Sequence, residues 1–384
     1  MSLADKVKQI YQQEFGGMPR VFSAPGRVNI IGEHTDYNGG LVLPAAIDKA
    51  AYLAIGPAEE NMGRWVSADF SESVDIDFNN INKSAKRWPN YILGIIDQFR
   101  KDGKEPSAFN AVLAADVPIG AGLSSSAAIE TVVAYAINER DGFGYKKIDL
   151  ALLAQKAEHE YIGLKVGIMD MFASLHGREG HVMRLDCRSL DFEYAPLELG
   201  NYKIVLFDTG VKHELASSEY NVRRQQCEEG VKILSQYYPE VKQLRDVTTE
   251  MLESHREEMD PVIYKRCYFV VEEIKRVDKA CDALRQGSLD QLGLLLYESH
   301  AGLQHDYEVS CRELDLLVKL VKDETFVLGA RMMGGGFGGC TINIIHKDSI
   351  NALIEKIGPV YKENTDTELH AYEVVTGDGA REIS

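Results

Sequence analysis

The sequence predicts an α+β protein of two domains, and three observations lead to that prediction. The chain has 384 residues, which at roughly 100–200 residues per domain is enough for two cores. Residues 21–56 alternate short apolar runs with Gly, Pro and Asn, which is typical of strands and turns. The second half is mostly helical by its pattern, and such segregation is typical of α+β proteins. We divide the chain into an N-terminal domain, 1–185, and a C-terminal domain, 186–384.

The elements of the first half follow from local patterns. Phe109–Ala115 is an apolar run that predicts a strand, and residues 118–122 form a loop with two glycines. Ser124–Glu139 is rich in Ala, Ile and Val and contains no Gly or Pro, which predicts a largely buried helix. A second helix, with Asp149 as its N-cap, is expected to end near Tyr161.

The elements of the second half are predicted in the same way. Tyr202–Phe207 predicts a buried strand, and Pro261–Arg285 predicts a long helix. Residues 310–313 (Ser-Cys-Arg-Glu) have the spacing of a capping box, so a helix is expected from there to about Val321. Two strands are expected to flank the glycine-rich run at 334–339.

Charge and cysteine content limit the class of protein. The chain has 42 Lys and Arg against 59 Asp and Glu, a net charge of −17, which argues against non-specific binding to nucleic acid or anionic membranes. None of the six cysteines forms a C-x-x-C pair, so neither a zinc cluster nor a disulfide framework is expected. The N-terminus lacks an apolar signal segment, and Pro44, Asp48 and Lys49 interrupt the longest apolar stretch. We therefore expect a soluble, cytoplasmic protein.

The first candidate site is the run Gly120-Ala-Gly-Leu-Ser-Ser-Ser126, between a predicted strand and a predicted helix. Glycines let the backbone approach an anion, and the start of a helix adds unpaired N–H groups and a positive dipole end. The serine hydroxyls suit phosphate oxygens or Mg²⁺, but no lysine follows the glycines as in a Walker A loop. A tight turn with a serine-rich cap explains the same residues, and the local sequence leaves both interpretations open.

The second candidate is Gly334-Gly-Gly-Phe-Gly-Gly339. It matches the G-x-G-x-x-G dinucleotide fingerprint, which requires a helix next, but residues 340–345 read as a strand. The Rossmann interpretation therefore fails. Five glycines in six residues indicate a close approach of the backbone to a neighbour or ligand, with a mobile loop as the alternative.

The third candidate follows an apolar run and contains Glu33, His34 and Asp36 within four residues. Such side chains bind the hydroxyls of a polar small molecule, although a solvated turn is the simpler alternative. No second histidine lies at ligand spacing, so His34 is not expected to bind a metal.

The fourth candidate pairs Glu158, on a predicted helix, with Asp170, which lies between two methionines. Glu158 offers the hard oxygen ligand that a cation requires. A carboxylate in apolar surroundings is usually paired or functional, and a helix cap is the structural alternative for Asp170.

Taken together and in this order, the four clusters resemble the GHMP small-molecule kinases, and among them the galactokinases. The superfamily pattern is the phosphate loop at Pro118–Ser126 with the late glycine-rich motif at 334–339. The resemblance runs from about residue 14 to near the C-terminus. The matches typical of galactokinases are Gly26–Tyr37, Gly167–Asp170, Ser218–Asn221 and Glu308–Cys311.

The resemblance implies ATP-dependent phosphorylation of the anomeric hydroxyl of galactose, with Mg²⁺. It places Asp170 where the family has its catalytic base and Arg27 where the family has the partner of that base, which stabilises the transition state. Ser126 and Glu158 occupy the Mg²⁺ ligand positions. The implied sugar contacts are Glu33, His34, Asp36, Tyr220 and the backbone of Gly167.

The resemblance also implies a fold and a nucleotide site. The fold would join an N-terminal ribosomal-protein-S5-like α/β domain to a C-terminal ferredoxin-like α+β domain, with the active site in the cleft between them. Relatives are often monomeric, so we expect a monomer. The implied ATP contacts are Ser67, Gly120, Ala121, Gly122, Leu123, Ser124, Ser125, Ser126, Gly335 and Gly336.

The implied roles suit the chemistry of phosphoryl transfer, which depends mainly on positioning and electrostatics. Asp170 can accept the proton of the sugar hydroxyl, and a nearby Arg27 would keep its carboxyl ionised. Two residues depart from the family pattern: Met171 stands where Gln is usual, and Met333 where Thr is usual. Both put the identity of the sugar in question more than the reaction.

Two alternatives remain at this stage. A kinase for a related sugar, such as N-acetylgalactosamine or another aldose, would differ by only a few hydroxyl contacts. A galactokinase-like sensor that binds ATP and sugar and regulates transcription would carry an altered phosphate loop, whereas residues 123–128, Asp170 and Arg27 are intact here. A mevalonate- or homoserine-type kinase has no reason to carry residues 32–37.

Overall fold

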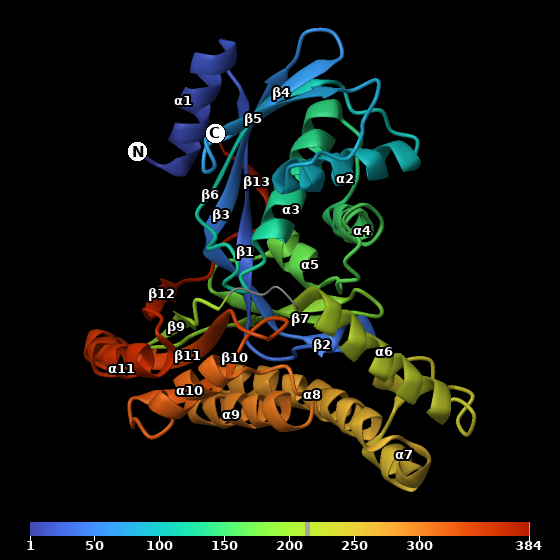
Figure 1. Cartoon of the computed structure of the whole chain (residues 1–384), viewed down its shortest axis with the longest axis vertical. Helices are drawn as coiled ribbons and strands as arrows, with labels where there is room; N and C mark the ends of the chain where they lie inside the picture. Colours follow the sequence, from blue (N-terminus) through green and yellow to red (C-terminus); the bar gives the residue numbers. More distant parts are fainter. Residues whose placement is uncertain (212–215, 384) are drawn as a thin grey trace.

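The structure is a computed structural model of the chain, and it describes residues 1–211 and 216–383. The side chains of 216–218, including Ser218 of the matched motif, lie outside the described part. The upper half of Figure 1 is a six-stranded sheet with a helix on one face and a helical layer on the other. In sheet order its strands are β13 (Arg381–Ile383), β1 (Arg20–Asn29), β3 (Pro44–Pro57), β6 (Phe109–Ala115), β4 (Met62–Ser67) and β5 (Glu72–Asp77).

Apolar side chains explain how the helices cover this sheet. Helix α1 buries Val7 and Tyr11 against β3 and β6, whereas α3 and α5 pack on the opposite face against β1 and β3. Helix α3 is buried almost all round because α2 and α4 cover its outer side. These helices are α1 (Leu3–Phe15), α2 (Arg87–Lys101), α3 (Ser125–Asp141), α4 (Lys147–Ala157) with the π-helical turn η2 (Glu158–Ile162), and α5 (Met169–His176).

The lower half of Figure 1 holds a four-stranded sheet and the long helices beneath it. Its strand order is β10-β11-β9-β12, with antiparallel pairs throughout. The strands are β9 (Tyr202–Asp208), β10 (Val327–Met332), β11 (Cys340–His346) and β12 (His370–Val374). The helices are α6 (Ala216–Leu234), α7 (Thr249–Ser254), α8 (Pro261–Arg285), α9 (Leu289–His305), α10 (Arg312–Val321) and α11 (Ile350–Thr365).

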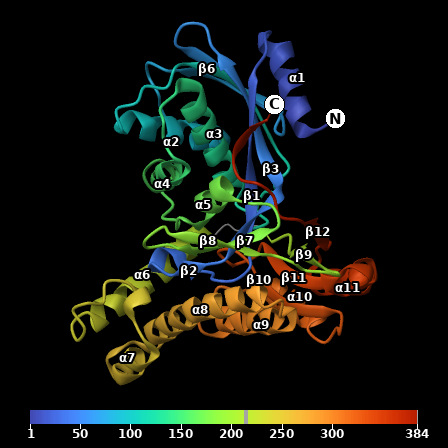
Figure 2. The same cartoon turned by 180° about the vertical axis from the view of Figure 1, so that it is seen from behind.

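Two features join the halves. A three-stranded sheet of β2 (Leu41–Val42), β7 (His181–Asp186) and β8 (Phe192–Pro196) lies between them (Figures 1 and 2). The last strand, β13, returns to pair with β1, which brings the two ends of the chain to the same region (Figure 2). The C-terminal strand thus lies in the sheet of the first half, on the other side of the predicted boundary. The division at 185/186 stays a prediction.

Several sequence-based predictions are confirmed. The strand at Phe109–Ala115 and the helix at Pro261–Arg285 have the expected bounds, and strands flank residues 334–339. The helix expected at Ser124–Glu139 is α3, and the strand expected at Tyr202–Phe207 is β9.

Two capping predictions are wrong. Asp149 is not an N-cap: the cap position is Lys146, and the Asp149 carboxylate accepts a hydrogen bond from its backbone N–H at 3.1 Å. The capping box at 310–313 does not form, because Cys311 takes the cap position without a side-chain bond and Ser310 instead donates to Asp315. In both places a neighbouring residue competes for the capping position, a choice that spacing alone does not resolve.

Among the residues that the structure describes, no helix combines the length and apolarity needed to cross a bilayer.

Arg331 is a cation buried where the two halves meet. Its side chain is fully buried in β10 and donates to the carbonyl of Ile30 at 2.8 Å and to the carbonyl of Asn29. It also contacts the carboxylate of Glu33 at 3.1 Å. A buried guanidinium is tolerated only when such partners replace water, so Arg331 holds the end of β1 against β10.

Replacing Arg331 by Met should therefore destabilise the protein by about 3–5 kcal/mol, because Glu33 would be left buried without its cation. Chemical denaturation measures this change, with Arg256→Met at an exposed ion pair as the control. Removing both charges, in Arg331→Met with Glu33→Gln, should recover part of the loss. A loss below about 1 kcal/mol in the single variant would contradict this account of the ion pair.

Candidate active site

The site begins at a bulge in strand β1. The register between β1 and β3 shifts between Pro25 and Arg27, and the backbone N–H of Arg27 donates to the carbonyl of Leu123 at 3.1 Å. A Cβ on Gly26 would lie 2.7 Å from that same carbonyl oxygen. Glycine is therefore required here for β1 to touch the loop that precedes α3.

Asp170 lies in the first turn of α5, facing this contact. The Arg27 Nε donates to Asp170 Oδ1 at 2.8 Å, and the Ser124 hydroxyl donates to Asp170 Oδ2. Arg27 also donates to the carbonyl of Gly122 at 2.5 Å. The Arg27 side chain is 6% exposed, whereas that of Asp170 is 27% exposed, so the carboxylate is held in place and still reachable from solvent.

The charge of Arg27 is maintained by its neighbours. Burial opposes the charge, but the carboxylates of Asp170, Glu33 and Asp36 outweigh that cost and raise the pKa of Arg27. The guanidinium is therefore a permanent cation beside Asp170.

The two glycine-rich runs meet at this point. Gly120 and Gly122 have positive φ angles of 81° and 74°. A Cβ on Gly122 would lie 3.3 Å from the carbonyl oxygen of Met333, and one on Gly334 would lie 3.6 Å from Gly122. The loop before α3 and the run at 334–339 thus pack backbone to backbone, which side chains would prevent.

Carboxylates from the third cluster lie near Arg27, and that of Asp36 also lies near Asp170. Glu33 is 2% exposed and accepts a hydrogen bond from the backbone N–H of Gly334 at 2.9 Å. The Asp36 carboxylate lies so close to Gly167 that any Cβ there would overlap it. Burial, followed by the charge of Asp170, raises the pKa of Asp36 to about 7.

His34 completes this cluster from a strained backbone position. It has a φ angle of 63° and is 4% exposed. Its ring lies 5.5 Å from that of Tyr220 and 4.8 Å from that of Tyr307, measured between centroids. Burial, followed by the charge of Arg223, lowers the pKa of His34 to about 3, so the imidazole is neutral near pH 7.

Ser126 at the start of α3 and Glu158 at the end of α4 form a separate polar group, with Glu130 of α3 close by. The Ser126 hydroxyl is within hydrogen-bonding reach of the Glu158 carboxylate. Burial raises the pKa of Glu158 to about 7, and burial together with Glu158 raises the pKa of Glu130 well above its usual range. Glu158 Oε2 is buried and has no hydrogen-bond partner among the described residues, so this group offers oxygen ligands with unused capacity.

Family profiles match three segments of the chain. Residues 9–57 match the galactokinase galactose-binding signature, residues 90–178 the GHMP kinases N-terminal domain, and residues 280–363 the GHMP kinases C-terminal domain. These segments contain the Glu33 cluster, the phosphate loop with Asp170, and the second glycine-rich run.

Curated relatives match almost the whole chain. A galactokinase of Thermotoga maritima is 42% identical over 361 residues, covering 94% of this chain and 99% of its own. A galactokinase of Lactiplantibacillus plantarum is 38% identical over 383 residues, covering 98% and 99%. The chain belongs to the galactokinase family. It is accordingly an enzyme with the kinase activity of that family.

Solved structures agree with this assignment. The galactokinase of Lactococcus lactis, solved in complex with galactose, superposes with a TM-score of 0.95 at 32% identity and covers 100% of both chains. The mevalonate kinase of Methanococcus jannaschii superposes with a TM-score of 0.66 at 20% identity, covering 94% of this chain and 99% of its own, which shows the shared fold alone. The predicted two-domain GHMP kinase fold is thereby confirmed.

The remaining residues expected at a galactokinase site lie in three settings. Ala121 and Leu123 are fully buried, so only their backbone can face a ligand. Ser125 is the first residue of α3 and is partly exposed. Ser67 is buried at the end of β4, opposite Leu113 of β6, the strand that leads into the phosphate loop.

The second glycine-rich run borders Tyr220 and the cluster of Glu33, His34 and Asp36. A Cβ on Gly335 would lie 3.5 Å from the Tyr220 ring, and Gly336 is closed in by the carbonyl of Val309. Of the two departures from the galactokinase pattern, Met171 is buried in the core and Met333 faces Gly122 through its carbonyl.

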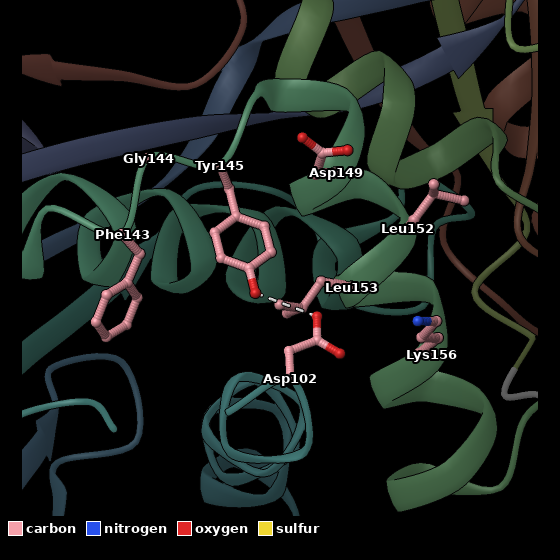
Figure 3. Close-up of a pocket in the computed structure, with 8 residues that line it drawn as sticks. All are labelled: Asp102, Phe143, Gly144, Tyr145, Asp149, Leu152, Leu153 and Lys156. Carbon is pink, nitrogen blue, oxygen red and sulfur yellow. Dashed lines mark hydrogen bonds between the residues drawn. The ribbon is translucent and has the colours of Figure 1, made fainter. Parts of the chain in front are cut away.

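A separate hollow lies away from the galactokinase site. It has a volume of about 350 Å³, and Figure 3 shows Tyr145 and Asp102 hydrogen-bonded within it. None of the residues assigned to the site lines this hollow. Its lining residues are Asp102, Phe143, Gly144, Tyr145, Asp149, Leu152, Leu153 and Lys156.

Three features of the site were not predicted from the sequence. The contact of the Ser124 hydroxyl with Asp170, made from a left-handed backbone (φ 58°), was not expected; the predicted contact of Ser124 with ATP stays a prediction. Arg331 was not singled out, although a lone Arg in an apolar strand was a usable signal. Tyr307 lies just before the matched segment Glu308–Cys311 and was not singled out, and no sequence signal places its ring beside that of His34.

Asp36 makes stability depend on pH. Because its pKa is higher in the folded chain (about 7) than its ordinary 3.8, the folded state binds this proton more tightly and loses stability as pH rises between these values. Asp36→Asn cannot ionise, so its advantage over wild type should be on the order of 2 kcal/mol greater at pH 8 than at pH 5. Urea denaturation at both pH values measures this difference. The exposed Asp191→Asn serves as the control, and an advantage that does not vary with pH would contradict the burial of Asp36 as its cause.

Proposed function

We propose that this chain transfers the terminal phosphoryl group of ATP to the anomeric hydroxyl of galactose, with Asp170 as the proton acceptor. Phosphorylation of galactose itself follows from membership of the galactokinase family. The observation that carries the mechanism is the position of Asp170. Arg27 and Ser124 hold its carboxylate between the phosphate loop and the proposed sugar-binding residues Glu33, His34 and Asp36.

Asp170 and Arg27 divide the catalytic work. Asp170 takes the proton from the attacking hydroxyl, whose oxygen forms the new bond to phosphorus while the bond to the ADP oxygen breaks. Arg27 holds the carboxylate in its orientation and places positive charge where negative charge spreads over the transferred oxygens. Because Arg27 is held by two acceptors, it needs little reorganisation during the reaction.

The sugar-binding residues in this proposal are the preformed polar groups around Asp170. Glu33 keeps an oxygen for a sugar hydroxyl while its other oxygen accepts from Gly334 and Arg331. His34, Asp36 and Tyr220 supply further polar contacts, with the backbone of Gly167 beside Asp36. Sites of this kind reject an analogue that leaves a buried polar group unpaired.

The nucleotide would lie against the residues of the two glycine-rich runs. Backbone N–H groups at the start of α3 bind the phosphates, and Gly335 and Gly336 close the site from β10. Ser67 contacts the nucleotide from β4.

The residues present also fit Mg²⁺. No cluster of three or more His, Cys, Asp or Glu with metal geometry occurs among the described residues. Mg²⁺, however, commonly uses one or two protein carboxylates together with substrate phosphates. Ser126 and Glu158 would hold it, and Glu158 Oε2, which has no hydrogen-bond partner among the described residues, would be free to act as a ligand. When bound, the ion would neutralise phosphate charge during transfer.

The comparisons do not favour the alternatives. The relatives described above are galactokinases along nearly their whole length, and neither a kinase for another sugar nor a regulatory sensor is needed to explain the site. We further propose that the protein works as a monomer in the cytoplasm, where its six free cysteines suit a reducing environment.

Asp170→Asn tests the proposed mechanism. The amide cannot accept the proton, so kcat should fall by about 10²–10⁴-fold. Galactose affinity measured by calorimetry should change by less than about threefold, because Asn has the shape of Asp: its Oδ1 can still accept from Arg27, and its Nδ2 can donate to the Ser124 hydroxyl. Asp191→Asn, at an exposed position, is the matched control and should keep wild-type turnover. Near-normal turnover of Asp170→Asn would refute the role of Asp170.

A further inference from the structure

A chain of hydrogen bonds runs from the proposed sugar site to a buried thiol. The His34 Nδ1 lies 2.8 Å from the Tyr37 hydroxyl, which lies 2.7 Å from the Tyr307 hydroxyl. The Tyr307 hydroxyl lies 3.3 Å from the Cys227 Sγ. These residues come from the turn after β1, the segment after α9, and α6. Tyr307 and Cys227 are fully buried.

All four groups are neutral near pH 7. Burial lowers the pKa of His34 to about 3 and raises that of Cys227 to about 11. Burial also raises the pKa of both tyrosines well above the usual range. Each hydroxyl and the thiol therefore carries one proton, and the imidazole carries one proton on one of its two nitrogens.

Counting these protons leaves two arrangements. If Tyr37 donates to His34 Nδ1, then Tyr307 must donate to Tyr37 and the thiol to Tyr307. The reverse arrangement starts from a proton on Nδ1 and ends with Tyr307 donating to sulfur. Any mixture leaves one of the three contacts with two protons or with none. Which nitrogen of His34 carries the proton, Nδ1 or Nε2, therefore depends on whether the Cys227 thiol donates or accepts at the other end of this hydrogen-bond chain.

The surroundings favour the first arrangement. Sulfur is a weak acceptor, and the side chain of Asn38 already lies within hydrogen-bonding reach of Cys227. The phenol-to-imidazole bond pairs a good donor with a good acceptor, whereas the reverse arrangement places a hydroxyl proton on sulfur. The Asn38 amide is itself held in place by the carbonyl of His34 at 2.9 Å.

We propose that Cys227, Tyr307 and Tyr37 position His34 as the tautomer with its proton on Nε2, so that His34 donates a hydrogen bond to a sugar oxygen. Nε2 is buried and makes no hydrogen bond of ordinary geometry among the residues that the structure describes. The backbone of Gly335 also interacts with the imidazole, so a sugar oxygen would compete with that backbone group for the Nε2 proton. The role in sugar binding rests on the proposed function. The tautomer is a property of the protein alone.

Nitrogen-15 NMR of histidine-labelled protein without sugar measures the tautomer directly. Pyrrole-type and pyridine-type nitrogens give separate signals, and His34→Gln assigns those of His34 by their loss. The expected result is a pyridine-type Nδ1 and a pyrrole-type Nε2. A pyrrole-type Nδ1 in the wild-type protein would overturn the proposal without any variant of the chain.

Variants test whether the hydrogen-bond chain from Cys227 to His34 sets the tautomer. Tyr307→Phe removes the link, so the His34 signals should move toward a mixture of tautomers. KM for galactose should rise about two- to tenfold, as expected for one weakened hydrogen bond, with a smaller change in kcat. Cys227→Ser keeps a donor and should preserve the wild-type tautomer, whereas Cys227→Ala should not.

Cys281→Ala is the matched control, since it removes a buried thiol on α8 that takes no part in the hydrogen-bond chain. It should leave both the tautomer and KM unchanged. An unchanged His34 tautomer in both Tyr307→Phe and Cys227→Ala would refute positioning by the chain. The expected tautomer changes without an effect on KM would instead place the failure in the sugar-binding role of His34.

Discussion

The buried guanidinium of Arg331 sets the geometry on which the site depends. It contacts the carbonyls at the end of β1 and the carboxylate of Glu33, and it lies in the strand that leads into the second glycine-rich run. A charge without water must keep its partners close, so this cation fixes the distance between the two halves of the protein. The same constraint brings Gly334 to Glu33 and Met333 to Gly122.

Carboxylates outnumber arginines around the contact between the two halves. Arg27 and Arg331 are the cations paired with site carboxylates, against Glu33, Asp36 and Asp170, with Glu130 and Glu158 close by. Burial, with the charge of the nearby Asp170 adding to it, raises the pKa of Asp36 and of Glu158 to about 7. Groups that are costly to ionise in the free protein are stabilised when hydroxyl donors or a cation arrive. The free site is therefore prepared for a polyhydroxyl ligand and a metal-bound phosphate, at some cost to stability.

Local chemistry predicted much of this architecture. The glycines at 120–122 and the serines that follow indicated a loop against a helix start, because few other structures need both residue types there. The long helix at 261–285 was visible from its Pro and its apolar spacing. The resemblance to galactokinases then placed Asp170 and Arg27 together, which no spacing rule could do across 143 positions.

The rest depends on tertiary contacts. Residues 34, 37, 227 and 307 meet only because α6 and the end of α9 pack against the turn after β1, and their hydrogen-bond chain has no local signature. The orientation of Ser124 toward Asp170 follows from one left-handed backbone angle. Asp149 shows the same limit at short range, since only the observed geometry distinguishes an N-cap from the third residue of a helix.

The most direct test of the central claim is the release of ADP from Mg-ATP by the purified protein with a panel of aldoses. The panel should contain galactose, 2-deoxygalactose, galactosamine, N-acetylgalactosamine, glucose, mannose and arabinose. A site built around Glu33, His34 and Asp36 for galactose predicts turnover largely confined to galactose and its 2-deoxy form. Strong preference for another sugar, or no turnover despite measurable galactose binding, would contradict the account.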